Sequence, residues 1–283
     1  MPKLNLIKCY GGLSYHANWI IENFPKDYIN YHYVEPYSGG YSVGLRKQPS
    51  VIESYNDLNF DLYNIFWQLR KNPEHFIKTL HNYNYSEETF QQAQESKLNK
   101  KVELKWSGTD IEYSNSPFYY AIYSLIINRM SRSGLGKNYA SSNRIRHGKS
   151  NGDEGSYLWW LHNTLPLIAD RIKNVRMYNK PALDLIEIFN ENNQLILIDP
   201  PWVSTTRVTT NAYGNYEMSL KDHKDLIDEI TPLHKAKIIL VGRSNPLYDE
   251  NLASWHKITR FATNNAAQNK VKSKKEISLW LNY

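Results

Sequence analysis

The chain has 283 residues, which is long enough to bury a sizeable core as one domain with an insertion or as two small domains. Its 41% hydrophobic and 22% charged residues exclude global disorder. The single cysteine, Cys9, excludes a disulfide framework and a thiolate zinc site, while the net charge of +6 favours a polyanionic partner.

The N-terminal segment and the hydropathy argue against a secreted protein and a membrane-spanning protein. Residues 1–12 lack the apolar core of a signal peptide, and no apolar run approaches the length that crosses a membrane. The nine histidines show no metal-ligand spacing, so we expect no metal. We expect a protein of the cytoplasm, with an oligomeric state left open between a monomer and a weak dimer.

Short apolar runs alternate with helical patterns along much of the chain. Strands are predicted at residues 31–35, 51–55, 195–198, 237–241 and 276–281. Helices are predicted at residues 59–70, 73–83, 118–127, 156–172 and 220–233. This alternation indicates an α/β fold with a mostly parallel, Rossmann-like sheet and helices on both of its faces.

The middle third of the chain differs from the rest. Residues 71–174 contain no convincing buried strand, and their apolar patterns are helical. We interpret this stretch as an inserted, mainly helical domain. Residues 1–70 and 175–283 would then form the domain that carries the sheet.

The first predicted strand runs into a glycine-containing turn, Glu35-Pro36-Tyr37-Ser38-Gly39-Gly40. A strand that opens into a Gly-Gly turn and then a helix lets backbone amides approach a ligand closely. The second strand ends at Asn56-Asp57. An acidic residue at this point of a Rossmann-like unit commonly binds the hydroxyls of a ribose, although Asp57 could equally cap the following helix.

A basic segment lies inside the predicted insertion, at residues 128–150. It carries six Lys or Arg residues and no acidic residue, and its glycines and serines are typical of a loop. Such a segment fits contacts to nucleic-acid phosphates, and a solvated basic loop is the alternative. The candidate contacts are Arg129, Arg132, Lys137, Tyr139, Arg144, Arg146 and Lys149. A second basic cluster, at residues 270–275, is a weaker candidate.

The most informative segment is Asp199-Pro200-Pro201-Trp202, here called the DPPW turn, which follows the apolar run 195–198. The run places a carboxylate at the carboxyl end of a central strand, where open α/β sheets bind ligands. The prolines remove backbone donors, so Asp199 and the Pro200 carbonyl can accept the N–H bonds of a base amine. Trp202 offers a face on which the base can stack.

Four blocks, in this order, resemble the Dam-like adenine-specific DNA methyltransferases of the phage- and prophage-associated branch. The blocks are the glycine loop Lys8–Gly12, the cofactor loop Glu35–Val43, the ribose-binding Asn56–Asn59 and the catalytic DPPW turn. Segments 129–137 and 276–283 are also similar to segments found there, so the resemblance spans nearly the whole chain.

The resemblance implies methyl transfer from S-adenosyl-L-methionine to adenine N6 in double-stranded DNA, with the target base flipped out of the duplex. It implies that residues 71–174 form a target-recognition domain and that Asp199, Pro200, Pro201 and Trp202 are catalytic. The implied cofactor contacts are Cys9, Tyr10, Gly11, Gly12, Glu35, Pro36, Tyr37, Ser38, Gly39, Gly40, Asp57, Asn59 and Asp199.

Two residues depart from the family pattern. Leu13 follows Gly12 where the family usually has lysine, and Trp202 stands where most members have tyrosine. The residues themselves leave alternatives open. These are methylation of RNA adenine or of the cytosine N4 amine in DNA, and a catalytically inactive relative that only binds DNA.

Overall fold

The computed structural model describes residues 4–9, 12–99, 104–107, 110–113, 116–140, 152–207, 213–233, 235–263 and 274–283. Its contacts divide the chain into two compact units. We call them the helical unit (residues 1–18, 39–47 and 60–174) and the sheet unit (19–38, 48–59 and 175–283). No helix in the described part of the chain is both long and apolar enough to cross a membrane.

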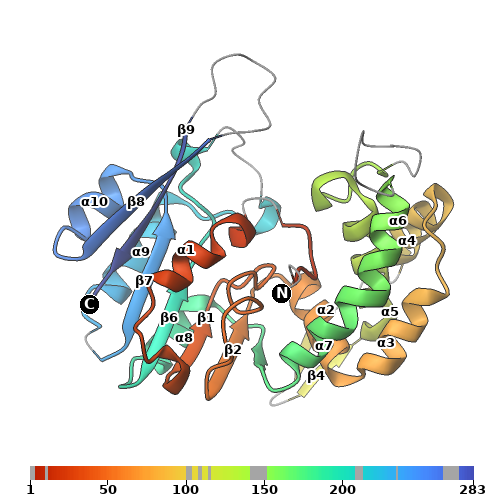
Figure 1. The fold of residues 1–283 in the computed structure, drawn as a ribbon, viewed down its shortest axis with the longest axis horizontal. Coiled ribbons are helices and arrows are strands. Elements are labelled where there is room, and N and C mark those ends of the chain that lie inside the picture. The colour runs from red at the N-terminus through yellow and green to blue at the C-terminus, as the bar shows by residue number, and fades with distance from the viewer. Residues whose placement is uncertain are drawn as a thin grey trace. The chain divides into compact units, whose positions relative to one another are not determined.

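The sheet unit is built on seven strands in the order β5-β2-β1-β6-β7-β9-β8 (Figure 1). They are β1 (His32–Glu35), β2 (Ile52–Asn56), β5 (Arg176–Tyr178), β6 (Gln194–Ile198), β7 (Lys237–Gly242), β8 (His256–Thr263) and β9 (Lys274–Leu281). The first five in the order run parallel, whereas β9 is antiparallel to both β7 and β8. The five predicted strands are confirmed, and β5 and β8 are additions to them.

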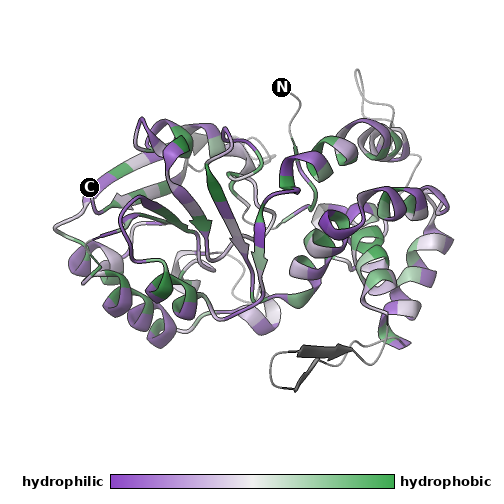
Figure 2. Cartoon of the chain, turned by 90° about the horizontal axis from the view of Figure 1, so that it is seen from below, coloured by the Kyte–Doolittle hydropathy of each residue, from purple (hydrophilic) through white to green (hydrophobic). Residues whose placement is uncertain are grey.

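Both faces of this sheet are covered, which confirms the predicted α/β class. On one face, alternate residues of β6 and β7 pack against α8 (Ala182–Ile188), α9 (Leu220–Ile230) and α10 (Pro246–Asn251). On the other face, the ring of Phe24 lies 5.6 Å from that of Tyr33 in β1, just after α1 (Ala17–Glu22). In Figure 2 some strands of the sheet carry long green stretches, and the helices show green and purple sides, as burial of one side requires.

The helical unit contains the helices that were expected in the middle third, together with further elements. Its elements are α2 (Phe60–Lys71), α3 (Pro73–His81), α4 (Glu87–Asn99), the hairpin β3 (Leu104–Ser107) and β4 (Asp110–Tyr113), α5 (Pro117–Met130), α6 (Gly152–Trp159) and α7 (Leu165–Ile172). A π-helical turn, Trp160–Thr164, joins α6 to α7. The predicted helices of this region are confirmed, whereas α4 and the hairpin were not predicted.

The two units do not coincide with the domain boundaries expected from the sequence. Residues 1–18, 39–47 and 60–70 pack with the helices, although the sequence assigns them to the sheet domain. The reason is that segments pack where they bury apolar surface, whatever their position along the chain. The assignment of residues 71–174 to target recognition stays a prediction.

The prediction of a helix after Gly40 is wrong, because residues 41–47 form a series of turns. Tyr41 has a φ of 53°, a left-handed value that does not continue into a right-handed helix. Single backbone bonds follow, from Leu45 N to Tyr41 O and from Lys47 N to Val43 O, each at 2.9 Å. The Tyr41 ring occupies the space beside Gly44, where a Cβ atom would lie 2.2 Å from it.

Candidate active site

Three parallel strands of the sheet unit end at one edge, and the predicted site residues of this unit follow directly. Strand β1 lies between β2 and β6, with Glu35 paired to Tyr55 and Val34 paired to Ile196. From β1 the next strand, β2, is added on one side of the sheet. Strands β6 and β7 are later added on the opposite side of β1. Such a change of direction marks the ligand-binding edge of open α/β sheets.

Asn56, at the end of β2, fastens three strand ends together. Its Nδ2 donates to the carbonyls of Pro36 at 2.8 Å and Lys180 at 3.0 Å, and its Oδ1 accepts from Lys180 N at 3.0 Å. The side chain is 1% exposed. The sequence placed Asn56 in the block expected to bind ribose, and its contacts to residue 180 could not be predicted because no local pattern marks them.

The turn after β1 is held by Ser38. Its hydroxyl donates to the Glu35 carbonyl at 2.7 Å and accepts from Asn56 N at 3.0 Å. The Glu35 carboxylate is buried and accepts a hydrogen bond from the Tyr33 hydroxyl at 2.6 Å. The predicted cofactor turn is thus fixed to the neighbouring strand through both side chains and backbone.

Asp57 begins the connection from β2 to α2. Its Oδ1 accepts from Asn59 N at 2.8 Å, and its carbonyl accepts from Asn179 Nδ2 at 2.7 Å. The first bond is a turn of the kind that precedes a helix, and α2 begins one residue later, at Phe60. The carboxylate is half-buried at the same edge as Glu35.

The DPPW turn places Asp199 at the end of β6, whose residues 195–198 are buried. The indole Nε1 of Trp202 donates to Asp199 Oδ1 at 3.1 Å. Burial raises the pKa of Asp199 to about 7, and the hydrogen bond from Trp202 opposes this rise. A carboxyl group with such a pKa changes its charge near neutral pH.

One residue that the sequence did not single out contacts the DPPW turn. The guanidinium carbon of Arg243, just after β7, lies 5.3 Å from the centre of the Trp202 ring, and Arg243 also donates to the Thr206 carbonyl. No periodicity marks Arg243, because it approaches the turn from a loop.

The helical unit contains the remaining predicted cofactor residues. A Cβ atom added to Gly40 would lie 3.2 Å from the Cys9 Sγ, and one added to Gly12 would lie 3.2 Å from the Cys9 Cβ. The backbone at Gly12 and Gly40 therefore packs closely against Cys9. Tyr10 and Gly11 lie outside the described residues.

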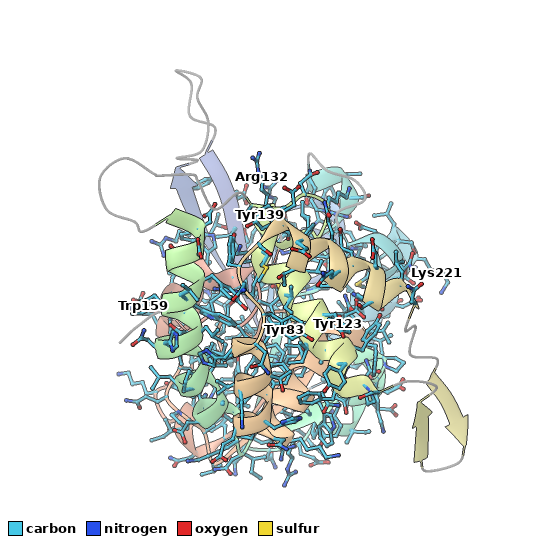
Figure 3. All side chains as sticks on the ribbon, turned by 90° about the vertical axis from the view of Figure 1, so that its right-hand side faces the viewer. Tyr83, Tyr123, Arg132, Tyr139, Trp159 and Lys221 are labelled. Atoms are coloured by element: carbon cyan, nitrogen blue, oxygen red, sulfur yellow. The ribbon has the colours of Figure 1, made fainter. Side chains whose placement is uncertain are left out.

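The described part of the basic segment belongs to the helical unit as well. Arg132 and Lys137 are exposed, and Tyr139 is half-buried, with its ring 5.6 Å from that of Tyr85 (Figure 3). Arg129 differs from them. Its guanidinium lies 3.9 Å over the Trp160 ring, and burial lowers the pKa of Arg129 to about 10.

Three other predicted nucleic-acid contacts, Arg144, Arg146 and Lys149, lie outside the described residues. The same is true of Lys270 and Lys272 in the weaker basic cluster. Among the residues that the structure describes, no group of three or more His, Cys, Asp or Glu side chains could hold a metal ion.

The geometry of the sheet unit suits the binding of a planar ring with an amino group. A carboxylate at the carboxyl edge of the sheet can accept an N–H bond, and the Pro200 carbonyl can accept another. Trp202 provides an aromatic face within three residues of that carboxylate. Asp57 offers a second carboxylate at the same edge, which suits hydroxyl groups.

A comparison with protein families gives one match. The family model described as D12 class N6 adenine-specific DNA methyltransferase matches residues 11–269. No curated protein matches the chain. The match contains every predicted site residue of the sheet unit, and its description names adenine N6 in DNA, in agreement with the first of the acceptors considered above.

Proposed function

This chain belongs to the D12 class of N6 adenine-specific DNA methyltransferases, and on that premise we propose that its methyl donor is S-adenosylmethionine and that the DPPW turn is its catalytic centre. The acceptor is the N6 amine of adenine in DNA. The observation that supports the proposal best is the hydrogen bond between Trp202 and Asp199 at the carboxyl end of β6.

The proposed chemistry is mainly positioning. Asp199 and the Pro200 carbonyl accept the two N–H bonds of the amine, and Trp202 stacks on the flipped base. The methyl sulfonium of the donor supplies an electrophilic carbon and a neutral thioether leaving group. With the donor bound, the amine lone pair would form the new C–N bond as the C–S bond breaks with its electron pair on sulfur, and the amine would lose one proton to Asp199 or to water.

The residues at the strand ends fit such a donor. Asp57 presents a half-buried carboxylate for a ribose hydroxyl pair. Gly39 has a φ of 50°, and among the described residues no atom beyond its chain neighbours lies within 4 Å of the point that a Cβ would occupy, which suits a close approach of a ligand to the backbone. The other expected contacts, which include Glu35, Asn59, Cys9 and Gly12, stay predictions.

We propose further that residues 71–174 recognise the DNA target. The exposed side chains of Arg132 and Lys137 support this role, because exposed cations on a loop can neutralise phosphates. Arg129 is a weaker candidate, because its guanidinium already stacks on Trp160.

The test uses the purified protein, labelled S-adenosylmethionine and unmethylated duplex DNA. Wild-type protein should transfer label, and digestion of the product to nucleosides should place it on N6-methyl-2'-deoxyadenosine. Asp199→Ala should lose at least about a hundredfold in rate, whereas Asp228→Ala, an exposed carboxylate on α9, serves as the matched control. Full activity in Asp199→Ala, with a native fold, would contradict the proposed role of the DPPW turn.

A further inference from the structure

The DPPW turn continues into a short segment that is held firmly as far as Thr206. Val203 is buried in the core of the sheet unit, and residues Ser204–Thr206 form a 3-10 turn. Thr206 bonds twice to the carbonyl of Val203, through its backbone N–H at 2.9 Å and through its hydroxyl at 2.7 Å. The Thr206 carbonyl is therefore a hydrogen-bond acceptor with a fixed position close to Trp202 in the chain.

Arg243 reaches this segment from the end of β7. Its guanidinium donates to the Thr206 carbonyl, and the guanidinium carbon lies over the Trp202 ring, 5.3 Å from the ring centre. The carbonyl of Arg243 accepts from Asn245 Nδ2 at 2.8 Å, and Asn245 Oδ1 caps α10 by accepting from Tyr248 N at 3.1 Å. Arg243 is thus fastened both at its backbone and at its guanidinium.

Two contacts together fix the orientation of the Trp202 ring. Its edge is held, because Nε1 donates to Asp199 Oδ1 at 3.1 Å. One of its faces is covered by the Arg243 guanidinium, a position in which the cation is attracted to the π electrons of the ring. Trp202 is half-buried, so part of the ring stays accessible to a ligand.

The position of the Arg243 side chain has a cost in stability. Its Nε is buried, and among the described residues it has no hydrogen-bond partner. A buried donor without a partner lowers the stability of a fold and is rare in folded proteins. An arrangement that costs stability is expected where it serves a functional site.

We propose that Arg243 is a positioning residue for methyl transfer, which covers one face of Trp202 so that the target base stacks on the opposite face. The inference rests on the proposed role of the DPPW turn. The contact with Asp199 fixes the edge of the ring, and the contact with Arg243 fixes its plane. The base amine meets Asp199 only when that plane is fixed, and a displacement of about 1 Å can slow such a reaction about a hundredfold.

The first test removes the cation and keeps an unbranched side chain, in Arg243→Met. The matched control is Arg260→Met, because the guanidinium carbon of Arg260 lies 5.9 Å from the centre of the Trp19 ring in the same sheet unit. We expect kcat of Arg243→Met, expressed per folded molecule, to fall about tenfold or more. The control should keep the wild-type kcat.

The same measurement separates positioning from binding. KM for S-adenosylmethionine and Kd for duplex DNA should stay within about threefold of wild type in Arg243→Met, because phosphate contacts dominate DNA affinity. Arg243→Gln, which keeps an N–H donor but removes the charge, should show the same loss of kcat. It takes the place of Arg243→Met if that variant does not fold.

Two results would overturn the inference. One is a kcat of the Arg243 variants that equals that of Arg260→Met, since the guanidinium would then be dispensable. The other is a kcat/KM for DNA above the wild-type value, which would show that Arg243 occupies the face that the base needs. If wild-type protein transfers no methyl group, the proposed function itself fails, and that outcome is distinct from both.

The second test asks whether Arg243 acts through the Trp202 ring. Trp202→Phe leaves a smaller aromatic face, which attracts a cation less strongly than an indole does. We expect Arg243→Met to lower kcat by a smaller factor in the Trp202→Phe background than in wild type. Equal factors in the two backgrounds would show that Arg243 acts independently of the ring and would overturn the proposed role.

Discussion

The indole N–H of Trp202 donates a hydrogen bond to the Asp199 carboxylate, 3.1 Å away. Trp202, which is proposed to stack on the base, thus also stabilises the negative charge of Asp199, which is proposed to accept an N–H bond of the base amine. Burial alone would favour a neutral carboxyl group, and the bond opposes that tendency. This opposition between burial and hydrogen bonding leads to three of the predictions below.

The first prediction concerns the pH dependence of methyl transfer. The ionised carboxylate of Asp199 accepts an N–H bond of the amine without competition from a proton of its own, and burial raises the pKa of Asp199 to about 7. We expect kcat/KM to be constant above about pH 8 and to fall about tenfold per pH unit below about pH 6. A profile that is flat from pH 5 to 9 would contradict the assignment.

The second prediction concerns Trp202. Trp202→Phe keeps an aromatic ring but removes the N–H that lowers the pKa of Asp199. The midpoint of the pH profile should therefore move to higher pH, so that the variant loses more activity at pH 6 than at pH 9. Trp255→Phe, which changes a tryptophan just before β8, is the control and should leave the midpoint where it is.

The third prediction concerns stability. The folded-state pKa of Asp199 is raised above 3.8, so the folded state binds the proton more tightly than the unfolded state. Wild-type stability should therefore fall as pH rises from about 4 to 7. At about 1.4 kcal/mol per pH unit between the two pKa values, Asp199→Asn should be more stable than wild type at pH 8.5 by up to about 4 kcal/mol. Urea denaturation at pH 8.5 and pH 4.5 measures this difference, which should shrink to about 1 kcal/mol at the lower pH, where the unfolded carboxyl is still mostly ionised.

The fourth prediction compares two glycines with left-handed backbones. Gly134 has a φ of 75°, and a Cβ there would lie 2.1 Å from the Lys8 carbonyl oxygen. Gly214 has a φ of 58°, with no atom within 4 Å of its Cβ position. Gly214→Ala should cost about 1–2 kcal/mol of stability from backbone strain alone. Gly134→Ala should cost more, because the clash adds to the strain, and equal costs in denaturant titrations would contradict this.

The fifth prediction concerns DNA binding. Arg132→Ala and Lys137→Ala should each weaken binding to duplexes of any sequence and reduce the slope of log K against log salt by about 1. The matched control is Lys221→Ala, whose side chain is 81% exposed on α9 (Figure 3). Unchanged salt slopes in both variants would remove the basic segment from the proposed DNA contact.

The strands and the catalytic turn could be predicted because their signals are local. A fully apolar run such as residues 195–198 has few alternatives to a buried strand, and a carboxylate directly after it must lie at the edge of the sheet. Strand β8 was missed because its residues, His256–Thr263, mix polar and apolar types on an exposed edge.

The anchor at Asn56 and the contact of Arg243 with the DPPW turn could not be predicted, because each joins residues through space. Asn56 and Lys180 are 124 residues apart, and the contact between Arg243 and Trp202 joins two segments of no regular period. The helix expected after Gly40 failed for a related reason. Tyr41 adopts a left-handed backbone so that its ring can fill a buried space, and tertiary packing outweighs the local preference.

The contacts of Lys8 impose an order on how the helical unit can be assembled. The backbone N–H and carbonyl of Lys8 bond to the side-chain amide of Asn128, the Lys8 ammonium group donates to the carbonyls of Arg129 and Ser131, and the Asn5 carbonyl accepts from the indole of Trp160. On a ribosome, residues 5–8 emerge long before these partners, which follow 120 to 155 residues later. The unit therefore cannot complete its packing cotranslationally until more than half of the chain has been made, which predicts slow, non-local folding and a period in which the early segment depends on chaperones.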